Sequence, residues 1–366
     1  MKITRIEPVQ VSLPYTHDGP LTGFGGAVWA TLSYLLVRVE TDDGLVGWGE
    51  AFGYGAIPAT IAAMETVVKP LALGKEVEDI ESFMTSLKKP LHIFGRSGPV
   101  QYALSGLDIA LWDLAGKRSG KSVGRLLADR VRDRVPAYKS FMRLEKPEII
   151  TRACVRAAAQ GYTSIKLHEI TIDAVAAARA ALGDDISLTL DVNCAWPADQ
   201  ALDMARQLQP YRLKWLEEPV WPPEDLRGLA VLRDQTDVPL ALGENLANAW
   251  SFMPLIEEGV VSYFQPSVTK MGGISEFNLV AHAARENGRT IAPHSPYFGP
   301  GLLATLQLAA AHEHIGGIEI FGVDLEQTLF GTIATVGTDG HIAIPDGPGL
   351  GCDPDPAVIE RYRVRA

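Results

Sequence analysis

Between Ser187 and Asn245, three apolar runs, SLTLDVN, LKWLEEP and LALGEN, each lead into acidic residues, and these runs decide the fold. The acidic residues Asp191, Glu217 and Glu244 follow one another at intervals of 26 and 27 residues. An interval of that length holds one strand, one loop, one helix and the return loop of a βα unit. Parallel neighbouring strands would therefore bring the three carboxylates to one rim of a sheet.

Three carboxylates packed at one rim repel one another, and their pKa values rise unless a cation lies between them. A ligand set made only of oxygen atoms favours a hard divalent ion, and Mg²⁺ keeps positions open for the oxygens of a substrate. The alternative reading is that each acid caps the helix that follows its strand. The matched spacing of the three acids favours the metal site.

The composition narrows the class of protein. The chain has 366 residues, is 47% hydrophobic and carries a formal net charge of −11, which argues against nucleic acid or an anionic membrane as a partner. The start, MKITRIEPVQV, reads as a strand and not as a signal peptide, and no segment has the length and apolarity of a membrane span. Three cysteines without paired spacing fit a reduced, cytoplasmic protein.

The first third of the chain predicts an α+β domain, residues 1–130. Apolar alternation over residues 3–13, TLSYLLVRVET and LVGWGEA, with the polar step Asp42-Asp43-Gly44 between the last two, predicts an antiparallel meander. Helical periodicity follows from residue 57 to residue 130. Its clearest helix is QYALSGLDIALWDLAGKRSG, whose leucines recur on one face.

After Pro136, short apolar runs alternate with amphipathic helices. Eight runs read as strands: VPAYKS, SIKLHE, SLTLDVN, LKWLEEP, LALGEN, YFQPS, TIAPHS and GIEIFG. Strands that alternate with helices in this way predict a (β/α) barrel over residues 131–322, with polar residues at the strand ends where barrel active sites form. The Gly- and Pro-rich segment 323–366 is expected to return to the N-terminal domain.

The motifs ALSGLDIALWDLAGK, LTLDVN, WLEEP and LGEN together resemble the enolase superfamily, in its mandelate racemase and muconate lactonizing enzyme branch. The resemblance covers almost the whole chain and implies a modified (β/α)7β TIM barrel with an N-terminal α+β capping domain. It implies Asp191, Glu217 and Glu244 as Mg²⁺ ligands. It also implies a small carboxylate substrate whose α-proton a base removes, with Mg²⁺ stabilising the enediolate. Relatives are commonly symmetric assemblies, so a homo-oligomer is expected.

The second barrel strand carries the expected base. Where many relatives have Lys-x-Lys, this chain has Lys166-Leu167-His168. Alternate strand residues share a face, so Lys166 and His168 both point into the barrel. His168 stands where the proton-abstracting lysine would be, and an imidazole titrates near neutral pH without help. Lys166 would keep His168 neutral by repulsion and bind a carboxylate oxygen. The alternative is a structural lysine and a histidine that caps a loop.

Across the barrel, His294 matches the seventh-strand histidine that pairs with an aspartate in racemases, but Ser267 occupies the aspartate position. A serine brings no charge to the ring, which suits His294 to donating a proton and favours elimination over racemisation. Lys270, three residues later, is either a substitute base or structural. Glu319 on the eighth strand is either a protonated donor to the enediolate or a buried structural carboxylate.

Further residues are assigned to binding. Asn193 and Asn245 are expected to support the ligand shell. In this family the capping loops, here 15–29 and 52–57, determine specificity. The expected lid of this chain is mixed polar and aromatic, and its side chains are Tyr15, His17, Phe24 and Trp29.

The sequence therefore predicts a Mg²⁺-dependent lyase that dehydrates a hydroxy or sugar acid. The nearest alternative is a racemase or epimerase that uses His168 and His294 on opposite faces of the carbon. Two further alternatives are a Schiff-base aldolase using Lys166 and a barrel that binds metal without turnover.

Overall fold

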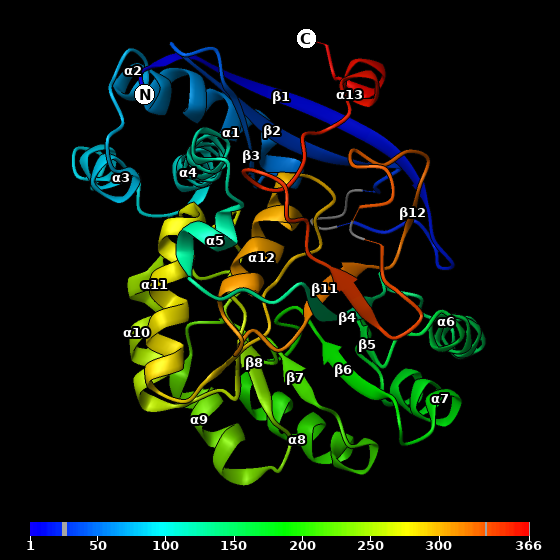
Figure 1. The fold of residues 1–366 in the computed structure, drawn as a ribbon. Helices are drawn as coiled ribbons and strands as arrows, with labels where there is room; N and C mark the ends of the chain where they lie inside the picture. The colour runs from blue at the N-terminus through cyan, green and yellow to red at the C-terminus, as the bar shows by residue number, and fades with distance from the viewer. Residues whose placement is uncertain (24–27, 334, 366) are drawn as a thin grey trace.

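The computed structural model describes residues 1–23, 28–333 and 335–365 and places a small antiparallel sheet, with helices, above a barrel (Figure 1). The small sheet contains β1 (Ile3–Thr16), β2 (Thr31–Thr41), β3 (Val46–Ala51) and β12 (Asp324–Leu325), in the order β12-β1-β2-β3. The β1–β2 and β2–β3 pairs are antiparallel, and Gly44 N–H donates to Thr41 O in the turn between β2 and β3. The predicted meander is confirmed.

The helices of the N-terminal region gather around α4, which packs on β2 and β3. They are α1 (Ile57–Ala63), the π-helical turn η2 (Met64–Val68), α2 (Lys69–Ala72), α3 (Ile80–Lys88), α4 (Gly98–Ser119) and α5 (Val123–Leu127), with the short 3-10 turn η1 (Tyr54–Ala56) before them. The predicted leucine face of α4 is fully buried. Its backbone lies so close to β3 that a Cβ on Gly49 would stand 1.9 Å from Gly106 O. Glycine in GWGEA is therefore a packing requirement.

The barrel has eight parallel strands, ordered β10-β9-β8-β7-β6-β5-β4-β11. They are β4 (Arg134–Ser140), β5 (Ser164–Leu167), β6 (Ser187–Asp191), β7 (Trp215–Glu217), β8 (Leu240–Leu242), β9 (Tyr263–Phe264), β10 (Thr290–Ile291) and β11 (Ile318–Phe321). The intervening helices, in chain order, are α6 (Pro147–Ala159), α7 (Ile172–Leu182), α8 (Ala198–Leu208) followed by η3 (Gln209–Tyr211), α9 (Leu226–Gln235), α10 (Ala249–Glu258), α11 (Gly273–Glu286) and α12 (Pro300–Ala311). All eight predicted strands are present, and the (β/α)7β barrel with an α+β partner is confirmed.

The barrel closes between β10 and β11 through the segment that precedes β11. Ile291 N–H donates to His314 O at 3.1 Å, and Gly316 N–H donates to Ile291 O at 2.9 Å. Farther along, Ser295 N–H donates to the Glu319 carboxylate at 3.1 Å. These bonds fix the loop after β10, which carries His294, against the end of β11.

Two buried carboxylates of the N-terminal region bind the first turns of barrel helices. Glu50 of β3 accepts from Gly301 N–H of α12 at 2.8 Å. Asp108 of α4 accepts from the backbone N–H of Ser275, in α11, at 3.1 Å. A carboxylate satisfies the free N–H groups of a helix N-terminus and interacts well with its dipole. These contacts hold the helices that follow the site loops of the sixth and seventh barrel strands.

The C-terminal segment divides between the two sheets. Its first strand, β12, pairs with β1, whereas β13 (His341–Ala343) pairs antiparallel with β4 of the barrel. Helix α13 (Pro356–Tyr362) packs near β1, and Val364 N–H donates to Gln10 O at 2.9 Å. The described helices include none that is long and apolar enough to cross a membrane.

Candidate active site

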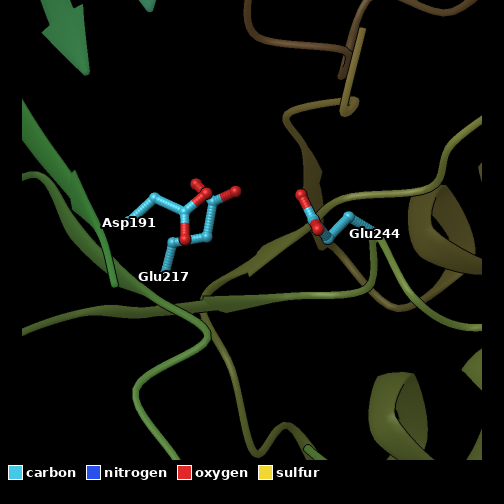
Figure 2. A group of neighbouring side chains, drawn as sticks. All are labelled: Asp191, Glu217 and Glu244. Carbon is cyan, nitrogen blue, oxygen red and sulfur yellow. The ribbon is translucent and has the colours of Figure 1, made fainter. Parts of the chain in front are cut away.

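Three acidic side chains from neighbouring strands converge at the carboxyl rim of the barrel (Figure 2). Asp191 ends β6 and Glu217 ends β7, and the two residues are register partners. Glu244 lies two residues beyond β8. One carboxylate oxygen from each lies within 4.8 Å of the others, and all three residues are buried. The regular spacing seen in the sequence therefore brings these acids together as expected.

The charges of this acidic trio are only partly balanced by the protein. Burial and the charge of Asp191 raise the pKa of Glu217 well above its usual range. Burial opposes ionisation of Asp191 too, but Lys166 and His168 outweigh it and lower that pKa. Asp191 Oδ2 is buried beside the Lys166 and His168 nitrogens, at 3.0 and 3.3 Å, but makes no well-aligned hydrogen bond with the described residues. A hard divalent cation fits a trio of oxygen donors with an open lone pair.

Lys166, on β5, lies beneath the trio and is fully buried. Its Nζ lies 2.5 Å from Glu217 Oε1, 3.0 Å from Asp191 Oδ2 and 3.2 Å from Glu319 Oε1. Burial alone would lower the pKa of Lys166, but these three carboxylates outweigh it, so the pKa is raised well above its usual value. The ammonium form of Lys166 is therefore favoured by its three carboxylate neighbours.

His168 follows β5 and lies beside Asp191. Its Nε2 lies 3.3 Å from Asp191 Oδ2, and its Nδ1 lies 2.5 Å from the backbone oxygen of Phe141. A carbonyl oxygen only accepts, so Nδ1 carries a hydrogen. The nitrogen that gains and loses a proton is therefore Nε2, which faces the trio.

His294 lies on the other side of the trio, on the loop after β10. Its Nε2 lies 3.1 Å from Glu244 Oε2, and its Nδ1 lies 3.2 Å from Ser267 Oγ and 3.3 Å from the Tyr297 hydroxyl. Ser267 and Tyr297 also hydrogen-bond to each other. Burial lowers the pKa of His294 to about 4.

Glu319, on β11, accepts from Ser295 N–H and pairs with Lys166. Burial raises its pKa, but the charges of Lys166 and His294 outweigh burial, so the net shift is downward. In this arrangement Glu319 is a carboxylate that accepts hydrogen bonds, which favours the second of the two roles considered for it.

A second layer of polar groups surrounds Glu244. Asn245 donates to both oxygens of Glu218, at 2.9 and 3.1 Å, and to Glu244 at 3.2 Å. Lys270 Nζ lies 3.3 Å from Asn245 Oδ1 and 3.8 Å from Glu244 Oε1. Asn193 donates its backbone N–H to Asp191 Oδ1 at 2.8 Å from a left-handed φ of 47°. Asn245 and Lys270 thus position Glu244 by a hydrogen bond and a nearby positive charge, and Asn193 positions Asp191 by a hydrogen bond.

The residues assigned to the lid lie in β1 or in the chain between β1 and β2. Tyr15 lies in β1 as part of the core and donates its hydroxyl to Trp29 O at 2.8 Å. His17 accepts from Gly19 N–H, and its Nε2 is buried without a hydrogen-bond partner in the described part of the chain. Trp29 packs on Tyr54 with ring centroids 4.9 Å apart. Phe24 lies outside the described residues.

Two site residues were missed from the sequence. Tyr297 contacts both Ser267 and His294. Tyr54, at the start of the 54–56 turn, feels the charges of Glu244 and Glu319, which add to burial in raising its pKa. A signal existed for each, since Tyr297 comes three residues after His294 and Tyr54 lies within a loop already assigned to specificity.

Comparisons with known proteins find relatives over almost the whole chain. Residues 16–128 match the model "Mandelate racemase / muconate lactonizing enzyme, N-terminal domain", and residues 149–358 match "Enolase C-terminal domain-like". An arabinonate dehydratase of Saccharolobus solfataricus is 30% identical over 92% of each chain. A 3,6-anhydro-alpha-L-galactonate cycloisomerase of Streptomyces coelicolor is 33% identical over 87% of this chain and 88% of its own.

A solved structure of a racemase from Streptomyces coelicolor A3(2) with bound magnesium superimposes with a TM-score of 0.86, at 28% identity, over 99% of this chain and 100% of its own. Together with the acidic trio, these matches settle the family. The chain belongs to the mandelate racemase/muconate lactonizing enzyme family of the enolase superfamily.

Proposed function

We propose that this protein is a Mg²⁺-dependent dehydratase of a sugar acid, and that it begins by abstracting the proton next to the substrate carboxylate. The observation that carries the proposal is the placement of the acidic trio between two imidazoles. Nε2 of His168 lies 3.3 Å from Asp191, and Nε2 of His294 lies 3.1 Å from Glu244. The arabinonate dehydratase relative supports the choice of a sugar acid.

Asp191, Glu217 and Glu244 would hold the ion. Bound Mg²⁺ supplies positive charge next to the substrate's carboxylate oxygens, where negative charge develops as the α-proton leaves. Lys166 adds a positive charge beside Asp191 and Glu217, two of the three proposed ligands. Since a proton next to a carboxylate is very weakly acidic, this concentration of charge is what makes its removal feasible.

His168 is the proposed base. Its Nδ1–H is held by the Phe141 carbonyl, so the ring orientation is set and Nε2 points at the trio. A positioned general base contributes about 10²–10⁴-fold to a rate. His294, beside Glu244, is proposed to give the departing hydroxyl the proton with which it leaves as water, a step that requires the ring in its imidazolium form because a neutral ring would be left as an imidazolate.

A second candidate is a cycloisomerase, which the Streptomyces coelicolor relative favours at 33% identity. A cycloisomerase would begin with the same proton abstraction as a dehydratase, but the bond that breaks next would lie within a ring of the substrate. The aldolase alternative is not favoured, because Lys166 is a buried ammonium paired with three carboxylates and has no free lone pair for a carbonyl.

The experiment is a screen of aldonic, aldaric and anhydro sugar acids with Mg²⁺. A dehydratase releases a 2-keto acid lighter than its substrate by one water, whereas a cycloisomerase gives a product of unchanged mass. Turnover of these acids only when EDTA is absent is the expected result. The borders of the three predicted segments, the homo-oligomer and the cytoplasmic location stay predictions.

A further inference from the structure

Glu217 of the acidic trio is held by two different kinds of donor. The ammonium of Lys166 lies 2.5 Å from Oε1, and the indole Nε1–H of Trp215 donates to Oε2 at 2.9 Å. Trp215 comes two residues before Glu217 on β7, and alternate residues of a strand share a face, so both side chains point into the barrel. We propose that Trp215 is a positioning residue for the metal site, whose neutral N–H holds Glu217 in place without adding a charge that repels Mg²⁺.

The indole ring of Trp215 is itself fixed by the barrel interior. It is buried and packs edge-on against Tyr138, with ring centroids 5.6 Å apart and planes at 83°. Tyr263 packs on it in a tilted arrangement at 4.9 Å, and Nζ of Lys214 lies 5.4 Å from its centroid. Edge-to-face rings and a cation over an indole are favourable arrangements. A ring packed in this way has little freedom to turn, so its single N–H stays directed at Glu217.

The two donors act differently on a bound cation. An ionised carboxylate has about four acceptor positions, so Glu217 can accept from both donors and still bind an ion. The charge of Lys166 balances the acids in the metal-free protein, but it also repels a divalent ion that approaches the same oxygens. An indole N–H is a neutral donor. The hydrogen bond from Trp215 therefore orients the carboxylate without this electrostatic penalty.

The other two acids of the trio also have neutral donors. Asp191 accepts from the backbone N–H of Asn193 at 2.8 Å, and Glu244 accepts from the side-chain amide of Asn245 at 3.2 Å. Trp215 completes this set. Groups that hydrogen-bond to metal ligands orient them, and removing such a group typically lowers metal affinity by about 10–100-fold. This role of Trp215 rests on the proposed use of the trio as a Mg²⁺ site.

Calorimetric titration of the full chain with Mg²⁺, without substrate, tests the role of Trp215. Trp215→Phe keeps an aromatic ring and removes the N–H, so it should weaken Mg²⁺ binding by about 10–100-fold. Trp250→Phe is the matched control, because Trp250 is 71% exposed and takes no part in the trio. Equal affinities in the wild type and in Trp215→Phe overturn the proposal.

Two further variants separate the hydrogen bond from packing and from charge. Trp215→β-(3-benzothienyl)alanine keeps both fused rings and places sulfur where the N–H was, so it should weaken Mg²⁺ binding as Trp215→Phe does, and it preserves the packing if phenylalanine does not. Lys166→Met removes a donor whose charge repels the ion, so it should bind Mg²⁺ at least as tightly as the wild type. Wild-type affinity in the sulfur isostere, or equal losses in Trp215→Phe and Lys166→Met, contradict the proposal.

NMR gives a readout of the hydrogen bond itself. The chain has seven tryptophans, and ¹⁵N labelling at tryptophan makes their indole N–H groups visible. The signal of Trp215, identified by its loss in Trp215→Phe, should shift when Mg²⁺ binds, whereas the signal of the exposed Trp250 should not. A Trp215 signal that stays in place at saturating Mg²⁺ overturns the proposal.

These measurements need no turnover, so the two proposals fail separately. Weaker Mg²⁺ binding in Trp215→Phe, in a protein that acts on no sugar acid, contradicts only the proposed function. Unchanged Mg²⁺ binding in Trp215→Phe, when the wild type is an active dehydratase, contradicts only the role given to Trp215.

Discussion

Nζ of Lys166 lies 2.5 Å from Oε1 of Glu217, with both side chains fully buried. Lys166 supplies part of the positive charge that balances the three carboxylates of the acidic trio. Lys166→Met should therefore destabilise the metal-free protein by about 3–5 kcal/mol, the usual cost of leaving buried charge unpaired. Urea unfolding in EDTA measures this.

The same unfolding experiment in excess Mg²⁺ is the control for Lys166→Met. Since Mg²⁺ would neutralise the same acids, the deficit relative to wild type should shrink when the metal is present. An equal deficit with and without Mg²⁺ would show that the lysine acts through packing and not through charge.

Glu217→Gln should weaken Mg²⁺ binding by at least tenfold, because it removes one negative ligand from the acidic trio. Calorimetric titration with Mg²⁺ measures the affinity. Glu65→Gln is the matched control, since Glu65 makes a surface ion pair with Lys69 and takes no part in the trio. Equal affinities in the two variants would remove Glu217 from the site.

Gly49→Ala tests the contact between the small sheet and α4. The new Cβ would stand 1.9 Å from Gly106 O, so the backbone must move, and overpacking of this kind costs about 1–3 kcal/mol or more. Gly55→Ala is the matched control, because a Cβ there meets nothing within 4 Å. Thermal midpoints should fall for the first variant only, and equal midpoints would show that the contact is looser than described.

His312 should make stability depend on pH. Burial, followed by the nearby charges of His282, His314, Arg285 and Arg132, lowers its pKa from 6.5 to about 4. Between these values the unfolded chain binds a proton that the folded chain does not, so stability is full above pH 6.5 and falls as pH drops toward 4.

Urea unfolding across that pH range measures the effect of His312, and His312→Gln keeps a polar side chain that can still bond to Asn278, the present partner of the ring. The variant should lose part of the wild-type decline in stability at low pH. Parallel pH profiles for the two proteins would assign the decline to other groups.

Much of the barrel could be predicted because its signals are local. Asp191, Glu217 and Glu244 end apolar runs at a βα interval, and that spacing alone brings them to one rim. The buried face of α4 follows from the period of its leucines. Strand alternation predicts that Lys166 and His168 share the inner face of the barrel.

What the sequence did not reveal depends on loop conformation. The hydroxyl of Tyr297 contacts Ser267 from the loop after β10, and this loop is bound to Glu319 through Ser295. The C-terminal segment splits between β1 and β4, and two short strands with no periodicity carry no sign of their partners. Likewise, the sequence around Lys166 does not indicate that its ammonium group lies beside three carboxylates.

The most direct test of the central claim is exchange of the substrate α-proton in D₂O, followed by ¹H NMR on a sugar acid that the screen identifies. We expect Mg²⁺-dependent exchange in the wild type, and a loss of about 10²–10⁴-fold in His168→Asn. Exchange that persists at the wild-type rate in His168→Asn, or that proceeds equally in EDTA, would contradict proton abstraction by His168 at a metal-bound carboxylate.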